Sequence, residues 1–209
     1  MERGILAIFH NVAPGREAYF DDWFQGEHLA ERLAVPEFLY ARRHKAISGA
    51  AGFFNFYITE NSAVLMSRAY LERIENPTPR TKIMMSEIFR DMNRTVCRRD
   101  FRLGKIRGGM TAAARFSSPP DAMALKCVLE EFGKDETVSG EIWCSAEQPG
   151  EIKEEEKLRG GDRKIRACLL VDVLHQAQAE KFGEQLQQNF PNAEVGVFRV
   201  LCHLGDGNA

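Results

Sequence analysis

Several segments of strand length carry apolar side chains on both faces, and this pattern most restricts the folds open to the chain. Successive side chains of a β-strand point to opposite faces of its sheet, so adjacent apolar residues indicate that both faces are buried. Such pairs occur in three segments: Ile5-Leu6, Phe53-Phe54 and Leu169-Leu170. The predicted sheets must therefore be covered on both sides, by helices or by other strands.

The order of the predicted elements repeats after Gly108-Gly109. The first half is expected to follow the order strand, helix, strand, strand, helix and strand. Its strands are expected at 5–12, 38–47, 53–59 and 95–106. Its helices are expected at 16–35, with an interruption at Gly26, and at 63–74, with a further helical stretch at 82–92. The same order is expected at 110–116, 121–132, 140–147, 165–174, 177–190 and 194–204. Because the halves begin about 105 residues apart, the chain is predicted to be a duplicated β-α-β-β-α-β unit, spanning 1–107 and 108–209.

Each such unit forms a four-stranded antiparallel sheet with helices on one face only. The open faces of the two sheets can cover each other, which explains the apolar residues on both sides of the strands. The predicted fold class is therefore α+β: two tandem ferredoxin-like units whose sheets pack face to face as an internal pseudo-dimer around an eight-stranded barrel-like core.

The helix expected at 16–35 carries an unusual pair of polar residues. Phe20, Trp23 and Phe24 form an apolar stripe at positions i, i+3 and i+4. The next positions of that stripe, i+7 and i+8, are Glu27 and His28, where apolar residues are expected. A carboxylate and an imidazole on a buried stripe mark this helix as the first place to look for chemistry.

Composition and motifs exclude several functions. A net charge of -2 and a pI near 6.2 give no reason to expect a nucleic-acid partner. No apolar run is long enough for a membrane span, and the start of the chain reads as a strand and not as a secretory leader. The five cysteines are scattered and odd in number, which favours free thiols in a reducing cytoplasm over disulfides or a zinc site. Nucleotide-binding, zinc-protease and serine-hydrolase signatures do not occur.

The first half resembles the dimeric α+β barrel superfamily of ferredoxin-like proteins, most closely its EthD-like and stress-responsive branches. In many of those proteins the first helix carries an aromatic residue and then a histidine, and a short turn leads into a second strand preceded by proline. Residues 23–32 and 35–43 match that arrangement, and 69–81 resemble the second part of such a unit. The resemblance covers residues 1–106. Beyond Gly108 it is topological, because the corresponding helix at 121–132 has no Glu-His pair.

This resemblance implies a fold more than an activity. The superfamily includes heme-degrading monooxygenases, cofactor-free monooxygenases, isomerases, polyketide cyclases and members without known activity. We expect no cofactor, since no heme-attachment motif is present and a heme would need His10, His203 or another histidine beside a roomy apolar cavity. The acidic run at 151–157 is interpreted as a solvated connection.

His28 and Glu27 are the candidate catalytic residues. A histidine titrates near neutral pH and suits acid-base chemistry on a carbonyl or a phenol. Alternatively, His28 is structural and bonds a backbone carbonyl where the helix bends. Glu27 could orient His28 or act as a base; the alternative is an ion pair with Arg32 or Arg42. Trp23 is either a ligand platform or a core residue.

Five further residues are candidate ligand contacts. Tyr40, Arg42 and His44 share one face of the strand at 38–47, and they line the space between the sheets unless the register is shifted by one residue. Arg99 lies on an apolar strand face and suits either a planar carboxylate or a salt bridge across the sheets. Tyr57 could offer its hydroxyl group to a ligand.

Two functions from different classes follow from these residues. The first is a cofactor-independent enzyme of monooxygenase, isomerase or cyclase type, acting on a small apolar or aromatic molecule with His28 as the acid-base group. The second is a non-catalytic small-molecule binding or stress-response module. If the protein has a chemical site, one site per chain is expected, in the first half. The sequence leaves open whether the internal pseudo-dimer also forms a homodimer.

Overall fold

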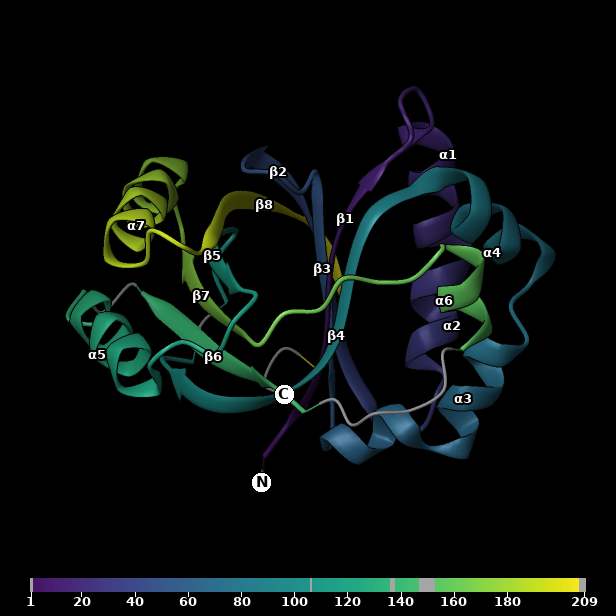
Figure 1. Ribbon diagram of the computed structural model, residues 1–209, viewed down its shortest axis with the longest axis horizontal. Coiled ribbons are helices and arrows are strands. Elements are labelled where there is room, and N and C mark those ends of the chain that lie inside the picture. The colour runs from purple at the N-terminus through teal and green to yellow at the C-terminus, as the bar shows by residue number, and fades with distance from the viewer. Residues whose placement is uncertain (1, 106, 136–137, 147–152, 207–209) are drawn as a thin grey trace.

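The computed structural model describes residues 2–105, 107–135, 138–146 and 153–206. Its centre is a closed antiparallel barrel with the strand order β1-β3-β2-β8-β5-β7-β6-β4, in which β4 also pairs with β1 (Figure 1). The α+β class and the eight-stranded barrel are as predicted. The strands are β1 Gly4–Val12, β2 Phe38–Ser48, β3 Phe53–Thr59, β4 Phe89–Leu103, β5 Met110–Phe116, β6 Ser139–Ser145, β7 Ala167–Val173 and β8 Glu194–Gly205.

The two halves of the barrel are joined by hydrogen-bonded strand edges. β2 pairs with β8, and β4 pairs with β6, so the two four-stranded segments form one continuous sheet. Closure removes the exposed strand edges that two separate sheets would present. β4 is long because it serves both halves: its first part pairs with β1, and 97–103 pair with β6.

Helices cover the outside of the barrel from two sides (Figure 1). α5 (Ala122–Phe132) and α7 (Gln176–Asn189) pack on the second-half strands. The first-half strands are covered by α1 Glu17–Trp23, α2 Leu29–Leu33, α3 Arg68–Glu75, α4 Pro79–Ile83 and α6 Glu154–Leu158, with a 3-10 turn at Ser62–Met66. In the described part of the chain, no helix is long and apolar enough to cross a bilayer.

One apolar core lies under the helices of each half, and a third fills the barrel itself. The rings of Phe9 and Phe54 stack with their centroids 4.3 Å apart, and Phe198 and Trp143 pack against Phe54. These side chains come from β1, β3, β6 and β8, so both halves contribute to the interior. The sheet of the first half is consequently buried on both faces, as the adjacent apolar residues indicated.

Two predicted helices differ from the structure. The helix expected at 63–74 is divided at Ser67, whose hydroxyl accepts a hydrogen bond from the Tyr70 N–H and caps α3. The stretch expected to be helical to residue 92 ends at Ile88, because Phe89 is already extended and pairs with Val12 of β1. The methionine-rich segment therefore runs on into the first residues of β4, which are buried beside the helices.

The acidic run was also interpreted wrongly in its described part. Residues 154–158 form α6, and Glu155 is buried against the first half instead of facing solvent. Residues 151 and 152 lie outside the described residues.

We expect Phe54→Ala to lower the free energy of unfolding by about 3–5 kcal/mol, because it removes a ring that is fully buried between both halves. Chemical denaturation measures this change. Met66→Ala is the matched control: Met66 is 60% exposed, and its removal should alter the free energy by no more than about 0.5 kcal/mol. Similar effects of the two substitutions would contradict a shared barrel core.

Candidate functional site

A π-helical turn, Phe24–His28, separates α1 from α2 and includes Gly26, where an interruption was expected. A π turn inserts one extra residue into the helical repeat, and such turns are frequent at functional sites. It rotates His28 onto the buried side of the helix, where the ring is 6% exposed and stacks on the Trp23 indole at 4.3 Å. A second π turn, Met84–Ile88, follows α4, and its Met85 lines the same cavity as His28.

His28 is a neutral imidazole in this position. Burial lowers its pKa well below the ordinary value, and the nearby positive charges of Arg32 and Arg159 lower it further. Its Nδ1 atom is buried and has no hydrogen-bond partner among the residues that the structure describes. The alternative prediction was that His28 bonds a backbone carbonyl where the helix bends, and Nδ1 makes no such bond in the described part of the chain.

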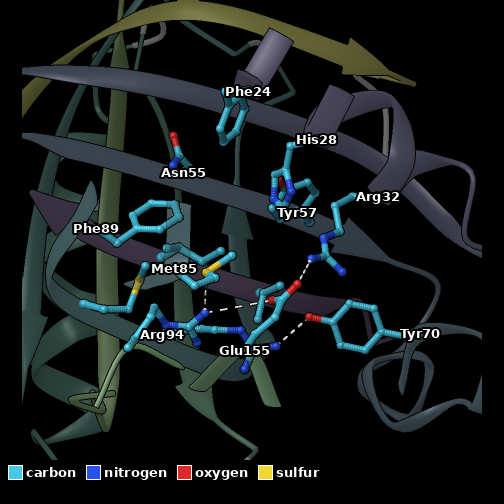
Figure 2. A pocket seen from close by; sticks show the side chains of 14 residues that line it. Phe24, His28, Arg32, Asn55, Tyr57, Tyr70, Met85, Phe89, Arg94 and Glu155 are labelled. Carbon is cyan, nitrogen blue, oxygen red and sulfur yellow. Dashed lines mark hydrogen bonds and ion pairs between the residues drawn. The ribbon is translucent and has the colours of Figure 1, made fainter. Parts of the chain in front are cut away.

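Tyr57 and Asn55 project from β3 toward the same cavity (Figure 2). The Tyr57 hydroxyl is buried without a partner, and burial raises its pKa, so it is a neutral phenol. The Oδ1 atom of Asn55 is likewise buried and without a partner.

His10 determines which way the Asn55 amide points. Its Nδ1 lies 3.1 Å from the Asn11 carbonyl oxygen, which can only accept, so Nδ1 carries the proton. Burial lowers the pKa of His10 to about 3, and its Nε2 is therefore an acceptor. The Asn55 Nδ2 group donates to that nitrogen at 3.0 Å. Asn55 Oδ1 is left as a hydrogen-bond acceptor on the cavity wall.

The far wall of the cavity is charged and comes partly from the second half of the sequence (Figure 2). Glu155 of α6 forms a buried ion pair with Arg32 of α2, and these side chains are 7% and 3% exposed. Arg94 donates to the Tyr70 hydroxyl at 2.5 Å. Arg32 still has one buried nitrogen, Nη1, without a partner.

Arg159 of the second half also lines the cavity, the other lining residues are apolar, and the cavity is small. Its volume is about 30 Å³, which accommodates one or two water molecules. A larger ligand requires part of the wall to move, and the Arg32–Glu155 and Arg159–Met85 contacts link the two halves at this wall. The apolar lining residues are Leu6, Ile8, Phe24, Met85, Phe89 and Met92.

The residues do not fit a heme, because His28 faces a space far smaller than a porphyrin and both nitrogens of His10 already have partners. Among the described residues, no three histidine, cysteine or acidic side chains lie close enough to hold a metal ion.

Two other residues of the opening helix serve its packing. Trp23 is fully buried, and its Nε1 donates to Thr81 Oγ1 at 3.3 Å. Glu27 is partly exposed and accepts a hydrogen bond from Thr78 Oγ1 at 2.6 Å. The alternative prediction for Glu27, an ion pair with Arg32 or Arg42, is not what the structure shows: those arginines pair with Glu155 and Asp172.

The remaining predicted residues lie on the opposite face of the sheet, inside the barrel. Tyr40, Arg42 and His44 point inward from β2, in the register that the sequence left open, and all three are buried. His44 Nδ1 lies 2.9 Å from the Phe54 carbonyl oxygen. Arg99 donates to Glu141 at 3.2 Å, the salt bridge that was weighed as its alternative. The structure therefore brings only Tyr57 and Trp23 close to His28.

Sequence reasoning missed six polar residues that line the cavity: Arg32, Asn55, Tyr70, Arg94, Glu155 and Arg159. Asn55 could have been found, because it is two residues from Tyr57 and is the polar exception in an aromatic strand. Arg32 follows His28 by one helical turn, a weaker indication. Glu155 had no local signal, since an acidic run ordinarily faces solvent.

No protein-family model matches the sequence, and no curated protein matches it by sequence comparison. Solved structures do share its fold. An anthrone oxidase-like protein superposes with a TM-score of 0.63 and 10% identity, covering 98% of this chain and 93% of that one. A candidate monooxygenase from Fusobacterium nucleatum subsp. nucleatum gives 0.61 and 10%, with coverages of 100% and 96%. A candidate chlorite dismutase gives 0.56 and 12%, with coverages of 100% and 97%.

These likenesses define the class of fold. The chain is an α+β barrel protein of the architecture found in monooxygenase-like and chlorite dismutase-like structures. At such low identity the likeness extends to the fold and not to an activity.

We expect the free energy of unfolding to fall as the pH drops below about 6.5. The pKa values of His10, His28 and His44 are lowered by burial, so between those values and 6.5 the unfolded chain binds more protons than the folded one. The contribution of these neutral histidines to the free energy of unfolding is fully present above about pH 6.5. Below that pH, each histidine lowers the free energy of unfolding by about 1.4 kcal/mol per pH unit.

Urea denaturation between pH 7.5 and 5.5 measures this slope. His28→Gln should reduce it by about one third, whereas His175→Gln, at an exposed residue, should leave it unchanged. An equal slope for His28→Gln and the unmodified protein would show that His28 is not buried as a neutral group.

Proposed function

We propose that the His28 cavity is a ligand site, and that the chain is a cofactor-independent enzyme acting on a small, largely apolar molecule that carries a hydroxyl group. One observation carries the proposal: in the described part of the chain, four buried polar atoms without partners lie around one small cavity. An unsatisfied buried polar atom costs about 1–3 kcal/mol, so a group of four in one place calls for a functional explanation. The atoms are His28 Nδ1, Arg32 Nη1, Asn55 Oδ1 and Tyr57 Oη.

The four atoms specify the ligand's polar groups. Asn55 Oδ1 can only accept, so it faces a hydroxyl or N–H group of the ligand. Arg32 Nη1 can only donate, so it faces an oxygen atom that carries or develops negative charge. The Tyr57 hydroxyl serves either kind of group. When the wall moves to enlarge the cavity, the apolar side chains between these positions would pack against a ring, which favours a hydroxylated aromatic or polyketide-like molecule.

In this proposal His28 takes a proton from the ligand. A neutral imidazole can accept a proton, and the ligand then becomes an enolate or phenolate. The positive charge of Arg32 stabilises the developing oxyanion in a site shielded from water. Glu27 lies at the edge of the helix, bonded to Thr78, and would support the position of the turn and not act as a base.

The fate of the anion distinguishes the three reaction types. Return of the proton to another atom is an isomerisation, and attack within the ligand is a cyclisation. With molecular oxygen as oxidant, a CH₂ group conjugated to the anion becomes a carbonyl group and the second oxygen atom leaves as water. The monooxygenase and anthrone oxidase-like names of the structural neighbours favour the last of these.

We further propose that residues 1–107 and 108–209 descend from one β-α-β-β-α-β unit of EthD-like type. The barrel order supports this, because its halves, β4-β1-β3-β2 and β8-β5-β7-β6, follow the same pattern. α5, which corresponds to the opening helix, carries no Glu-His pair, so we infer one site per chain. Free thiols, two of them buried, are consistent with a reducing cytoplasm.

A thermal-shift screen with phenols, naphthols and anthrone, followed by oxygen uptake and product absorbance, tests the activity. We expect His28→Gln to lower kcat by about 10²–10⁴-fold while KM changes less, because the base acts on bound substrate. His175→Gln is the matched control and should retain full activity. Binding without turnover of any probe would favour the non-catalytic module, and equal turnover by His28→Gln would exclude His28 as the base.

A further inference from the structure

The ion pair between Arg32 and Glu155 uses only part of the Arg32 guanidinium group (Figure 2). The Nη2 atom of Arg32 donates to Glu155 Oε1, whereas Nη1 is buried and has no partner among the described residues. The other carboxylate oxygen of Glu155 lies 3.9 Å from Arg159 Nη1, which is too long for a hydrogen bond. An arginine that binds a carboxylate frequently makes two parallel hydrogen bonds to it. Glu155 therefore leaves one donor of this carboxylate-binding group unused.

Two further arginines line the same cavity. Arg159 is neutralised by Asp162, to which its Nε and Nη2 atoms donate at 2.8 Å and 2.6 Å. Arg94 donates to the neutral Tyr70 hydroxyl and forms no ion pair in the described part of the chain. Glu31, which precedes Arg32 on α2, does not line the cavity and is not ion-paired among those residues. The cavity wall therefore includes one cation, Arg94, that no carboxylate contacts directly.

Glu155 belongs to α6, a short helix that is held to the first half largely by polar contacts. Leu158 is its one apolar residue, and it packs against the first-half core. Lys153, which precedes the helix, donates to Glu75 at 3.1 Å, and Glu155 accepts from Arg32. A ligand that offers a carboxylate to Arg32 replaces one charge-assisted hydrogen bond by others of the same kind, so the exchange costs little free energy.

We propose that the ligand of the His28 cavity is a hydroxylated aromatic carboxylate, and that its carboxylate group takes the place of Glu155 on Arg32. This inference rests on the proposed function and narrows its substrate class. The ligand carboxylate accepts from both Nη1 and Nη2 of Arg32, and Arg94 adds a second positive charge. The hydroxyl group of the ligand donates to Asn55 Oδ1, which places the ring beside His28. Glu155 is then an internal competitor, which holds Arg32 until a ligand carboxylate displaces it.

Isothermal titration with 4-hydroxybenzoate tests the proposal, with 4-hydroxybenzamide as the neutral isostere. We expect the carboxylate to bind at one site per chain and more tightly than the amide. Glu155→Gln removes the competing charge with little change of shape. It should tighten 4-hydroxybenzoate binding by about tenfold and change the amide affinity by less than about twofold.

A double variant isolates the contribution of Arg32. Arg32→Gln is made together with Glu155→Gln, because Arg32→Gln alone would leave a buried glutamate without its partner. Compared with Glu155→Gln, the double variant should lose about tenfold or more of the preference for the carboxylate over the amide. Thermal unfolding confirms that each variant is folded.

Glu154→Gln is the matched control, because Glu154 lies on the same helix, pairs with Lys157 at 3.8 Å and does not line the cavity. It should bind both compounds like the unmodified protein. A tightening by Glu154→Gln as large as that by Glu155→Gln would overturn the competition by Glu155.

The two proposals can fail separately. Equal affinity for the carboxylate and the amide, or equal tightening of both by Glu155→Gln, would overturn the carboxylate assignment. The ligand site itself would stand in that case if Tyr57→Phe, which removes a hydroxyl group from the cavity, weakened binding of both compounds. Binding of neither compound to any folded variant would overturn the ligand site and the carboxylate assignment together.

Discussion

Closure of the barrel is the constraint on which the rest of this structure depends. The β2–β8 and β4–β6 pairings leave no free strand edge between the halves and bury the inner face of every strand. Helices bury most of the outer face, so the middle of the first-half sheet is covered on both sides, and residues such as Lys45 and Arg98 are exposed nearer the strand ends. Every buried polar side chain on that sheet must then find a partner within the protein or lose hydrogen bonds, because buried polar groups are costly when unpaired.

The two faces of the sheet meet this requirement to different degrees. Inside the barrel, Glu141 and Asp172 use both of their oxygens in hydrogen bonds, and one buried atom, His44 Nε2, lacks a partner among the described residues. On the helix side, His28, Asn55 and Tyr57 each keep a buried polar atom without a partner. The first arrangement gives a specific and rigid interior. The second resembles a binding site, in which the missing partners are supplied by a ligand.

Both faces of the first-half sheet depend on segments from different parts of the sequence. Glu155, from the connection between β6 and β7, closes the His28 cavity by pairing with Arg32 of the first half. Glu141 of the second half likewise holds Arg99 and Arg107, which come from the end of the first half. A first half alone would therefore lack one wall of its own cavity. Because both halves belong to one chain, these contacts form without a second molecule.

The sequence by itself determined the α+β class, the order of the eight strands and of the helices other than α6, and the burial of both faces of the sheet, because these follow from local periodicity and turn residues. It also singled out His28, as a polar residue on an apolar stripe. Only the tertiary structure decided that Tyr40, Arg42 and His44 lie across the sheet from His28, since the register of β2 is set by its pairing with β3 and β8. Burial of Glu155 was equally beyond the sequence, because an acidic residue enters the interior only where a distant arginine meets it.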